Sequence, residues 1–184
     1  MTGLILPIKR IFSFIAIAVL AGCRQQGSEW VCKEAGVSFR LPNPSEWDQV
    51  PLPRDEGKLG LHQIDGNSSI AFIAFKRRPG EVMDQKFVDR FEGGMYKKPG
   101  LEKISGEFLT FKGREGYKIL DKKRDDDATR TAILMWFEKD YLLEIAATTS
   151  DSDPLTNSTV REFIESIRFL PELTNEVTAA KSHP

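Results

Sequence analysis

Hydrophobic residues recur with the period of β-strands along much of the chain. Val37, Phe39 and Leu41 alternate with polar residues, which is typical of a strand with one buried face. Two apolar runs without this alternation, at 70–75 and 132–137, are typical of strands buried on both faces. Further strands are predicted at 106–111, at 114–120, within 131–149 as a hairpin that turns near Lys139 and Asp140, and in a short final strand within 167–171.

Three segments between these strands are less regular. Residues 43–50 resemble a turn, and 58–64 form at best an edge strand. Residues 121–130 are polar and are expected to form a loop. Three consecutive aspartates within that loop, 125–127, offer oxygen ligands for calcium, but the spaced ligands and the glycine of an EF-hand loop are lacking. We therefore expect a solvated loop there, with a metal site as the alternative.

Helical spacing predicts two helices. The first spans 82–96, and the second begins near Thr159, which has the capping-box spacing from Glu162. Because the central strands are apolar on both faces, helices are the available covers for the sheet. The predicted fold class is α+β, an antiparallel sheet covered by helices in an α/β/α sandwich. The apolar positions are Met83, Phe87, Phe91 and Met95 in the first helix and Val160, Phe163, Ile164 and Ile167 in the second.

The start of the chain has the pattern of an export signal. Two basic residues precede an apolar run at 11–20, which is too short for a membrane-spanning helix. The tetrapeptide Leu20-Ala21-Gly22-Cys23 resembles the lipobox of bacterial lipoproteins, in which the cysteine sulfur receives a diacylglyceryl group. The resemblance implies that 1–22 is a signal peptide and that Cys23 is lipidated, with acyl chains such as palmitate as the anchor. An ordinary secretory signal is the alternative.

This resemblance sets the expected organisation and location. A lipidated tether and N-terminal segment would occupy 23–35, a single α+β domain 36–170, and a flexible tail 171–184. In Gram-negative lipoproteins an aspartate after the lipidated cysteine tends to retain the protein at the inner membrane, but this chain has Arg24. We expect an extracytoplasmic, lipid-anchored protein, at the outer membrane if the host is Gram-negative. Its expected partners are the bilayer, through Cys23, and an envelope protein.

The second cysteine raises a competing possibility. The chain has two cysteines, so lipidation of Cys23 leaves Cys32 without an intramolecular partner. Cys32 follows Trp30 and Val31, and we expect it to be a small buried side chain, with a reactive or intermolecular thiol as the alternative. If Cys23 is not lipidated, a disulfide between Cys23 and Cys32 is the obvious competitor.

Charge and motifs give little sign of catalysis. The formal net charge is -1, without long blocks of one sign, which gives no reason to expect a nucleic-acid partner. Motifs for a serine nucleophile, a phosphate loop, a zinc site or a dinucleotide site are lacking. The two histidines, His62 and His183, are expected at the surface. We therefore expect no enzyme activity, no cofactor and no metal.

Glu144 is the one acid inside an apolar strand. It shares its face with Leu142 and Ala146, where a buried carboxylate without a partner would be unusual. We expect that part of the face to be open to water, or Glu144 to pair with a lysine or arginine across the sheet. A carboxylate that contacts a ligand is the alternative.

The layout of residues 36–170 resembles the PsbP-like group of exported bacterial domains. The similarity rests on "VSFRLPNPSEW", a core strand, a helix, "LTFKGREGYKIL", a long hairpin with a tyrosine in its second strand, and a helix that ends in "SIRF". It implies an antiparallel sheet between helices, in a group that includes binding and assembly factors. We expect a membrane-anchored envelope lipoprotein of non-catalytic binding or assembly type. The alternative is a hydrolase or small-ligand-binding protein with an acid-lined pocket near Glu144.

Overall fold

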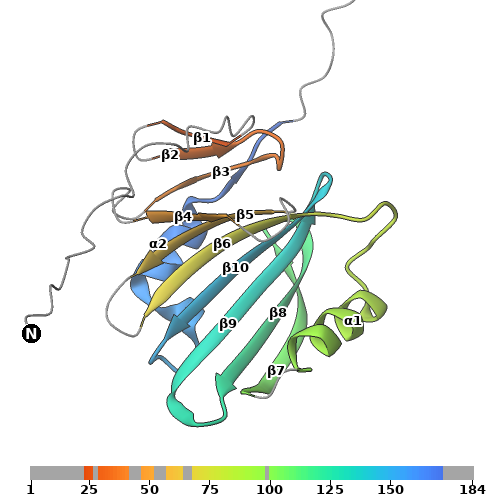
Figure 1. Ribbon diagram of the computed structural model, residues 1–184. Helices are drawn as coiled ribbons and strands as arrows, with labels where there is room; N and C mark the ends of the chain where they lie inside the picture. Colours follow the sequence, from red (N-terminus) through yellow and green to blue (C-terminus); the bar gives the residue numbers. More distant parts are fainter. Residues whose placement is uncertain are drawn as a thin grey trace, which may run out of the picture.

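The computed structural model describes residues 29–41, 68–97 and 100–171, together with the backbone of 23–26, 47–51 and 57–63 (Figure 1). These residues form two antiparallel sheets and two α-helices. The main sheet has seven strands in the order β4-β5-β6-β10-β9-β8-β7, and the smaller sheet has four in the order β1-β2-β3-β11. The predicted antiparallel pairing is therefore confirmed. No helix among the described residues is long and apolar enough to cross a membrane.

The elements have the following bounds. The main sheet contains β4 (Trp47–Pro51), β5 (Gly57–Gln63), β6 (Ser69–Lys76), β7 (Leu101–Phe111), β8 (Arg114–Lys123), β9 (Asp126–Glu138) and β10 (Tyr141–Thr149). The smaller sheet contains β1 (Cys23–Gln26), β2 (Glu29–Cys32), β3 (Val37–Arg40) and β11 (Arg168–Phe169). The helices are α1 (Gln85–Met95), α2 (Ser158–Ser166) and the short 3₁₀ helix η2 (Pro154–Thr156).

A hydrophobic core lies on each face of the main sheet. Successive residues of β10 point to opposite faces, as the pleat requires. Leu143 and Ile145 pack with Phe163 of α2 on one face, while Leu142 packs with Phe87 of α1 on the other. The smaller sheet contributes to the α2 side, where Trp30, Phe39 and Phe163 belong to the same core. Each helix thus covers one face of the sheet, although α1 lies over β7, β8 and β9 rather than over its centre (Figure 1).

Side-chain caps determine where the helices begin. The Asp84 carboxylate accepts a hydrogen bond from the Phe87 amide at 2.8 Å, so α1 begins at Gln85 rather than at 82. The Asn157 side chain accepts hydrogen bonds from the Thr159 and Val160 amides and is the N-cap of α2. The predicted capping box at Thr159 is wrong, because α2 begins one residue earlier, at Ser158, and Thr159 lies inside its first turn rather than at the cap.

Three segments contain more strand than the sequence predicts. Most of 121–130 continues β8 and β9, with a turn only at 124–125, and the ion pair between Lys122 and Asp127 at 2.5 Å joins the two strands. The segment 47–51 is the strand β4 rather than a turn. β5 is an inner strand because β4 occupies the edge beside it. Polar residues could enter these strands because backbone pairing does not depend on side-chain hydrophobicity.

The N-terminal segment is also part of the fold. Residues 23–35, expected to hold a tether, contain β1 and β2. Trp30 is buried and its ring lies 5.7 Å from that of Phe39 in the neighbouring strand β3. The predicted signal peptide at 1–22 and residues 172–184 of the predicted tail lie outside the described residues.

Candidate functional site

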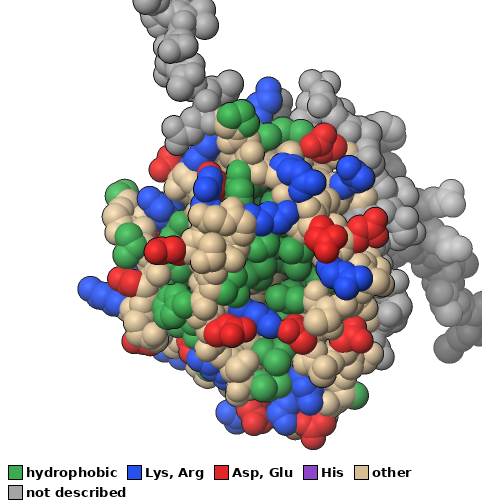
Figure 2. Space-filling model, turned by 180° about the vertical axis from the view of Figure 1, so that it is seen from behind, with side chains coloured by type: hydrophobic (Ala, Val, Ile, Leu, Met, Phe, Trp, Pro, Cys, Tyr) green, Lys and Arg blue, Asp and Glu red, His purple; other side chains and the backbone are tan. Residues whose placement is uncertain are grey.

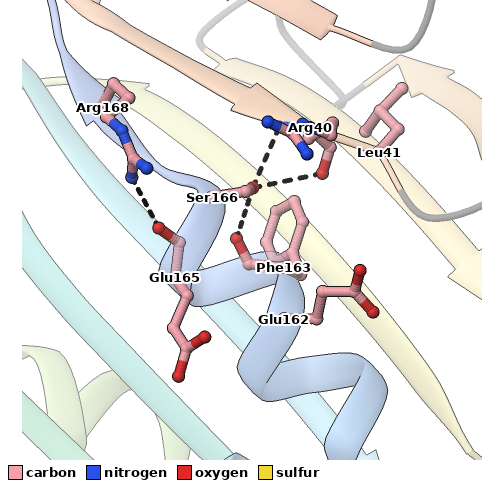
Figure 3. A pocket seen from close by; sticks show the side chains of 7 residues that line it. All are labelled: Arg40, Leu41, Glu162, Phe163, Glu165, Ser166 and Arg168. Atoms are coloured by element: carbon pink, nitrogen blue, oxygen red, sulfur yellow. Dashed lines mark hydrogen bonds between the residues drawn. The ribbon is translucent and has the colours of Figure 1, made fainter.

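A shallow hollow of about 240 Å³ opens where the C-terminal end of α2 meets β3 and β11 (Figure 3). We call it the α2 hollow. Two of its polar side chains, Ser166 and Arg168, hydrogen-bond to nearby backbone groups. The Ser166 hydroxyl accepts a hydrogen bond from the Arg40 amide at 2.9 Å and donates to the Phe163 carbonyl at 2.7 Å. The hollow is lined by Arg40, Leu41, Glu162, Phe163, Glu165, Ser166 and Arg168.

Two cations cap the end of α2 beside this hollow. The Lys112 ammonium donates to the carbonyls of Glu165 at 2.9 Å and Ile167 at 2.8 Å, and the Arg168 guanidinium donates to the Glu165 carbonyl at 2.6 Å. Cations at a helix C-terminus stabilise it. Burial, followed by repulsion from Arg168, lowers the pKa of Lys112. The two cations therefore stabilise the end of the helix. The residues that line the α2 hollow include no histidine that could activate Ser166 as a nucleophile.

On the side of the molecule that carries α2, the described residues present side chains of both charges (Figure 2). In Figure 2 hydrophobic side chains gather at its centre, and positive and negative side chains surround them.

A second hollow, of about 380 Å³, lies between the segment before α1 and the hairpin of β7 and β8. We call it the edge hollow. Phe108, which lines it, is one of three large hydrophobic side chains among the described residues that are exposed to solvent. Val82 is 58% exposed, Phe108 48% and Ile104 45%. Exposed groups of this kind mark binding surfaces more often than single apolar residues do. The edge hollow is lined by Met83, Phe108, Leu109, Thr110, Glu115 and Gly116.

An ion-pair cluster fixes α1 to the sheet beside the edge hollow. The Lys103 ammonium lies 2.6 and 2.7 Å from the two oxygens of Glu92, and the Tyr117 hydroxyl donates to Glu92 at 3.0 Å. The hydrogen bond to Glu92 raises the pKa of Lys103. Gly106 makes this meeting possible, because a Cβ there would lie 2.2 Å from the Tyr117 hydroxyl. Phe108 packs edge-on against Tyr117, with ring centroids 4.9 Å apart.

Glu144, the candidate ligand contact from the sequence, is buried. It is 7% exposed, and its partners in the register are Ile73 on β6 and Met135 on β9. The expectation that this face is open to water, or that Glu144 pairs with a cation, is therefore wrong, because apolar neighbouring strands enclose it. Burial alone raises its pKa to about 7. Glu144 lines neither the α2 hollow nor the edge hollow.

Asp121 is a second buried acid, which the sequence did not single out. It is 1% exposed, and neither carboxylate oxygen makes a hydrogen bond. Burial raises its pKa to about 6, and the nearby Tyr96 hydroxyl offsets this only in part, without a hydrogen bond of normal geometry. Asp121 was missed because 121–130 was expected to be a loop. Its spacing from Tyr117 and Ile119, which are buried in β8, would have placed it on the same face.

The two cysteines lie in paired strands. Cys23 and Cys32 are directly opposite one another in the register of β1 and β2. Cys32 is 2% exposed, as expected, but it is disulfide-bonded, and Cys23 is the only other cysteine in the sequence. A sulfur atom cannot be in a disulfide and carry a thioether-linked lipid at the same time. The Cys23 sulfur can therefore form the disulfide or carry the lipid, but not both.

The two histidines are the remaining candidates from the sequence. His62 belongs to β5, where only the backbone is described, and His183 lies outside the described residues. Among the residues that the structure describes, no three histidine, cysteine, aspartate or glutamate side chains gather as metal ligands would.

Comparison with known proteins identifies the fold. No family model matches the sequence, and no curated protein matches it. The solution structure of cyanobacterial PsbP (CyanoP) from Synechocystis is similar, with a TM-score of 0.56 and 12% identity over 85% of this chain and 98% of that chain. The Ran-binding protein Mog1p from Saccharomyces cerevisiae gives a TM-score of 0.45 and 10% identity, over 77% of this chain and 94% of that chain. The described chain has a PsbP-like fold.

Proposed function

We propose that the protein is a bacterial envelope lipoprotein, anchored outside the cytoplasm through Cys23, whose PsbP-like domain binds a protein partner without catalysing a reaction. The observation that carries the proposal is the edge hollow itself, which is lined by the hydrophobic side chains of Met83, Phe108 and Leu109 and in which Phe108 is 48% exposed. Exposed hydrophobic side chains add no stability to a monomeric domain. In a binding surface they are buried against the partner and contribute to affinity. The proposal includes a three-layer α/β/α arrangement.

The buried acids favour binding over hydrolysis. Glu144 lies among apolar residues and Asp121 has no hydrogen-bond partner for its carboxylate. General acid–base catalysis needs such a group within reach of the reacting atom in an accessible site. Glu144 lines neither hollow, and Asp121 is absent from the lining of both. A hydrolase or small-ligand site with an acid-lined pocket near Glu144 therefore has less support than a protein-binding role.

The lipid anchor rests on the lipobox pattern and is tested against the disulfide. A Cys23→Ser variant can form neither the lipid thioether nor the disulfide. A Cys32→Ser variant is the matched control, because it loses only the possibility of the disulfide. We expect Cys23→Ser to leave the membrane fraction and Cys32→Ser to stay there after a high-salt wash. Two or three acyl chains bury many methylene groups at about 0.8 kcal/mol each, which holds the anchored form essentially permanently. Retention of Cys23→Ser in the washed membranes would contradict the anchor.

Crosslinking tests the binding role. A photocrosslinking residue at position 108, introduced into the anchored chain in its own cells, is expected to give one dominant adduct. The same residue at position 161 on α2, which is exposed and lines neither hollow, is the control. Equal labelling from both positions would show that the exposed apolar surface is not the binding surface.

A further inference from the structure

Cys23 lies at one end of the smaller sheet. It is directly opposite Cys32 in the register of β1 and β2, and Cys32 is followed at once by the turn 33–36 that leads into β3. Because Cys23 is paired within a strand, a lipid on its sulfur joins the fold without a free tether between them. The lipid would therefore bring this end of the molecule to the bilayer.

Two further turns lie beside the turn 33–36 (Figure 1). A Cβ on Gly36 would lie 2.7 Å from the Lys139 side chain, so the turn contacts the hairpin turn between β9 and β10. The Arg77 amide donates a hydrogen bond to the Asp140 carbonyl at 2.7 Å, which places the end of β6 beside the same hairpin turn.

The turn between β7 and β8 completes this end of the molecule. Arg114, just after that turn, forms an ion pair of 2.7 Å with Glu138 at the end of β9. We call the four segments together the anchor end, and they are 33–36, 76–78, 112–114 and 138–140.

The anchor end carries more positive than negative side chains. It has seven lysines and arginines against three aspartates and glutamates, which gives it a net charge of +4, whereas the whole chain is at -1. One of its acids, Glu138, is neutralised by Arg114, and Glu81 just beyond it is neutralised by Arg90. The cations are Lys33, Lys76, Arg77, Arg78, Lys112, Arg114 and Lys139, and the acids are Glu34, Glu138 and Asp140.

The opposite end of the main sheet lacks this excess among its described residues. The turn between β8 and β9 has three cations at 122–124 and three aspartates at 125–127. Asp151 and Asp153 follow β10 at the same end. The positive charge is therefore on the side of Cys23.

Three cations of the anchor end are not used within the described fold. Lys33, Lys76 and Arg78 are exposed, and none of their side chains makes an ion pair or a hydrogen bond with a described residue. Lys112, by contrast, caps α2, and Arg114 pairs with Glu138. The charges of the three exposed cations are available to an anion outside the molecule.

We propose that the anchor end docks on the anionic phospholipid headgroups of the membrane that holds the lipid of Cys23, with Lys33, Lys76 and Arg78 toward the headgroups. Each lysine or arginine near an anionic surface strengthens the attraction by about fivefold, within a range of roughly 8 Å at physiological salt. An acyl chain and a basic surface together form a stronger anchor than either alone. The inference rests on the proposed lipid anchor and specifies how it orients the domain.

Hydrogen exchange of the mature protein, purified from its own cells, tests this orientation. The protein is reconstituted into vesicles of phosphatidylcholine alone and into vesicles that also contain phosphatidylglycerol. We expect amides in 33–36, 76–78 and 138–140 to exchange at least about tenfold more slowly in the anionic vesicles. Exchange at 123–126 should be the same in both, and high salt should remove the difference.

Two triple variants separate the position of the charges from their number. Lys33→Gln, Lys76→Gln and Arg78→Gln together should abolish most of the slowing. The matched control removes three exposed cations outside the anchor end and should keep the slowing. An equal loss in both variants would overturn the inference. The control combines Lys123→Gln, Arg124→Gln and Arg161→Gln.

The lipid anchor and the docked orientation fail in different ways. Flotation with anionic but not with neutral vesicles would contradict the lipid anchor and support the basic surface. Flotation with both kinds of vesicle, but with equal exchange rates, would overturn the orientation and leave the anchor intact. Protection of the anchor end in native membranes but not in lipid vesicles would identify an acidic protein as the occupant and would also overturn it.

Discussion

Replacing Glu144 by glutamine tests whether a buried acid without a partner lies in the core. The side chain is 7% exposed between Ile73 and Met135, and burial raises its pKa from an ordinary value of 4.5 to about 7. Below the lower value the carboxyl is protonated in both the folded and the unfolded chain, and folding carries no charge penalty. As the pH rises toward 7, the folded chain binds more protons than the unfolded chain, so stability falls.

The structure sets the size of this effect. A difference of one in pKa corresponds to 1.36 kcal/mol, so the shift to about 7 makes the folded state about 3 kcal/mol less stable above neutral pH than at acid pH. Glutamine keeps the shape of the side chain but cannot ionise. We therefore expect the stability of Glu144→Gln relative to the natural chain to increase by about 3 kcal/mol between roughly pH 4 and pH 8.

Urea unfolding of both chains across this pH range measures the difference directly. Asp121 has a raised pKa and changes stability in the same direction, but its contribution is common to both chains and cancels on subtraction. A polar amide left unpaired in the core lowers the variant's stability by an amount independent of pH. A difference that stays constant with pH, or that favours the natural chain more as pH rises, would refute the burial of an unpaired carboxyl at this position.

Four further substitutions test the packing and the cap of α2. Phe163→Ala removes a fully buried ring that packs 5.2 Å from that of Phe39, and should destabilise the fold by about 3–5 kcal/mol in urea unfolding; a loss below about 1 kcal/mol would mean that α2 is not part of the core. Asn157→Ala removes the cap of α2 and should cost about 1 kcal/mol in the same assay, whereas an unchanged midpoint would contradict the cap. Gly116→Ala brings a Cβ to 2.9 Å from the Met135 carbonyl oxygen and should lower the melting temperature. Gly94→Ala, whose Cβ would have nothing within 4 Å, should stabilise α1 by about 0.5–1 kcal/mol. A higher melting temperature for Gly116→Ala than for Gly94→Ala would contradict the packing of β8 against β9.

Much of the sheet could be predicted from the sequence because its strands show two clear patterns, alternation and continuous apolar runs. Alternation located β3, and the apolar runs located β6 and the centre of β9. The hairpin turn was expected at Lys139 and Asp140, where the structure has it, with φ of 50° at Lys139. These features depend only on neighbouring residues, which is the range over which a pattern is informative.

Features that depend on distant residues could not be predicted. The burial of Glu144 is set by strands on both sides of β10, and nothing in its own segment distinguishes it from an exposed acid. Asp121 looked like the start of a polar loop because ladder pairing between β8 and β9 is invisible to hydropathy. The edge hollow joins residues near 83, 108 and 115, which only the folded chain brings together.

The central claim is that one sulfur atom anchors a binding domain to a membrane, and the mass of the mature N-terminus tests it most directly. Mass spectrometry of the N-terminal peptide of protein purified from its own cells should show a chain that begins at residue 23 and carries a diacylglyceryl thioether on Cys23. A peptide in which Cys23 and Cys32 are joined by a disulfide, with no added lipid mass, would contradict the account.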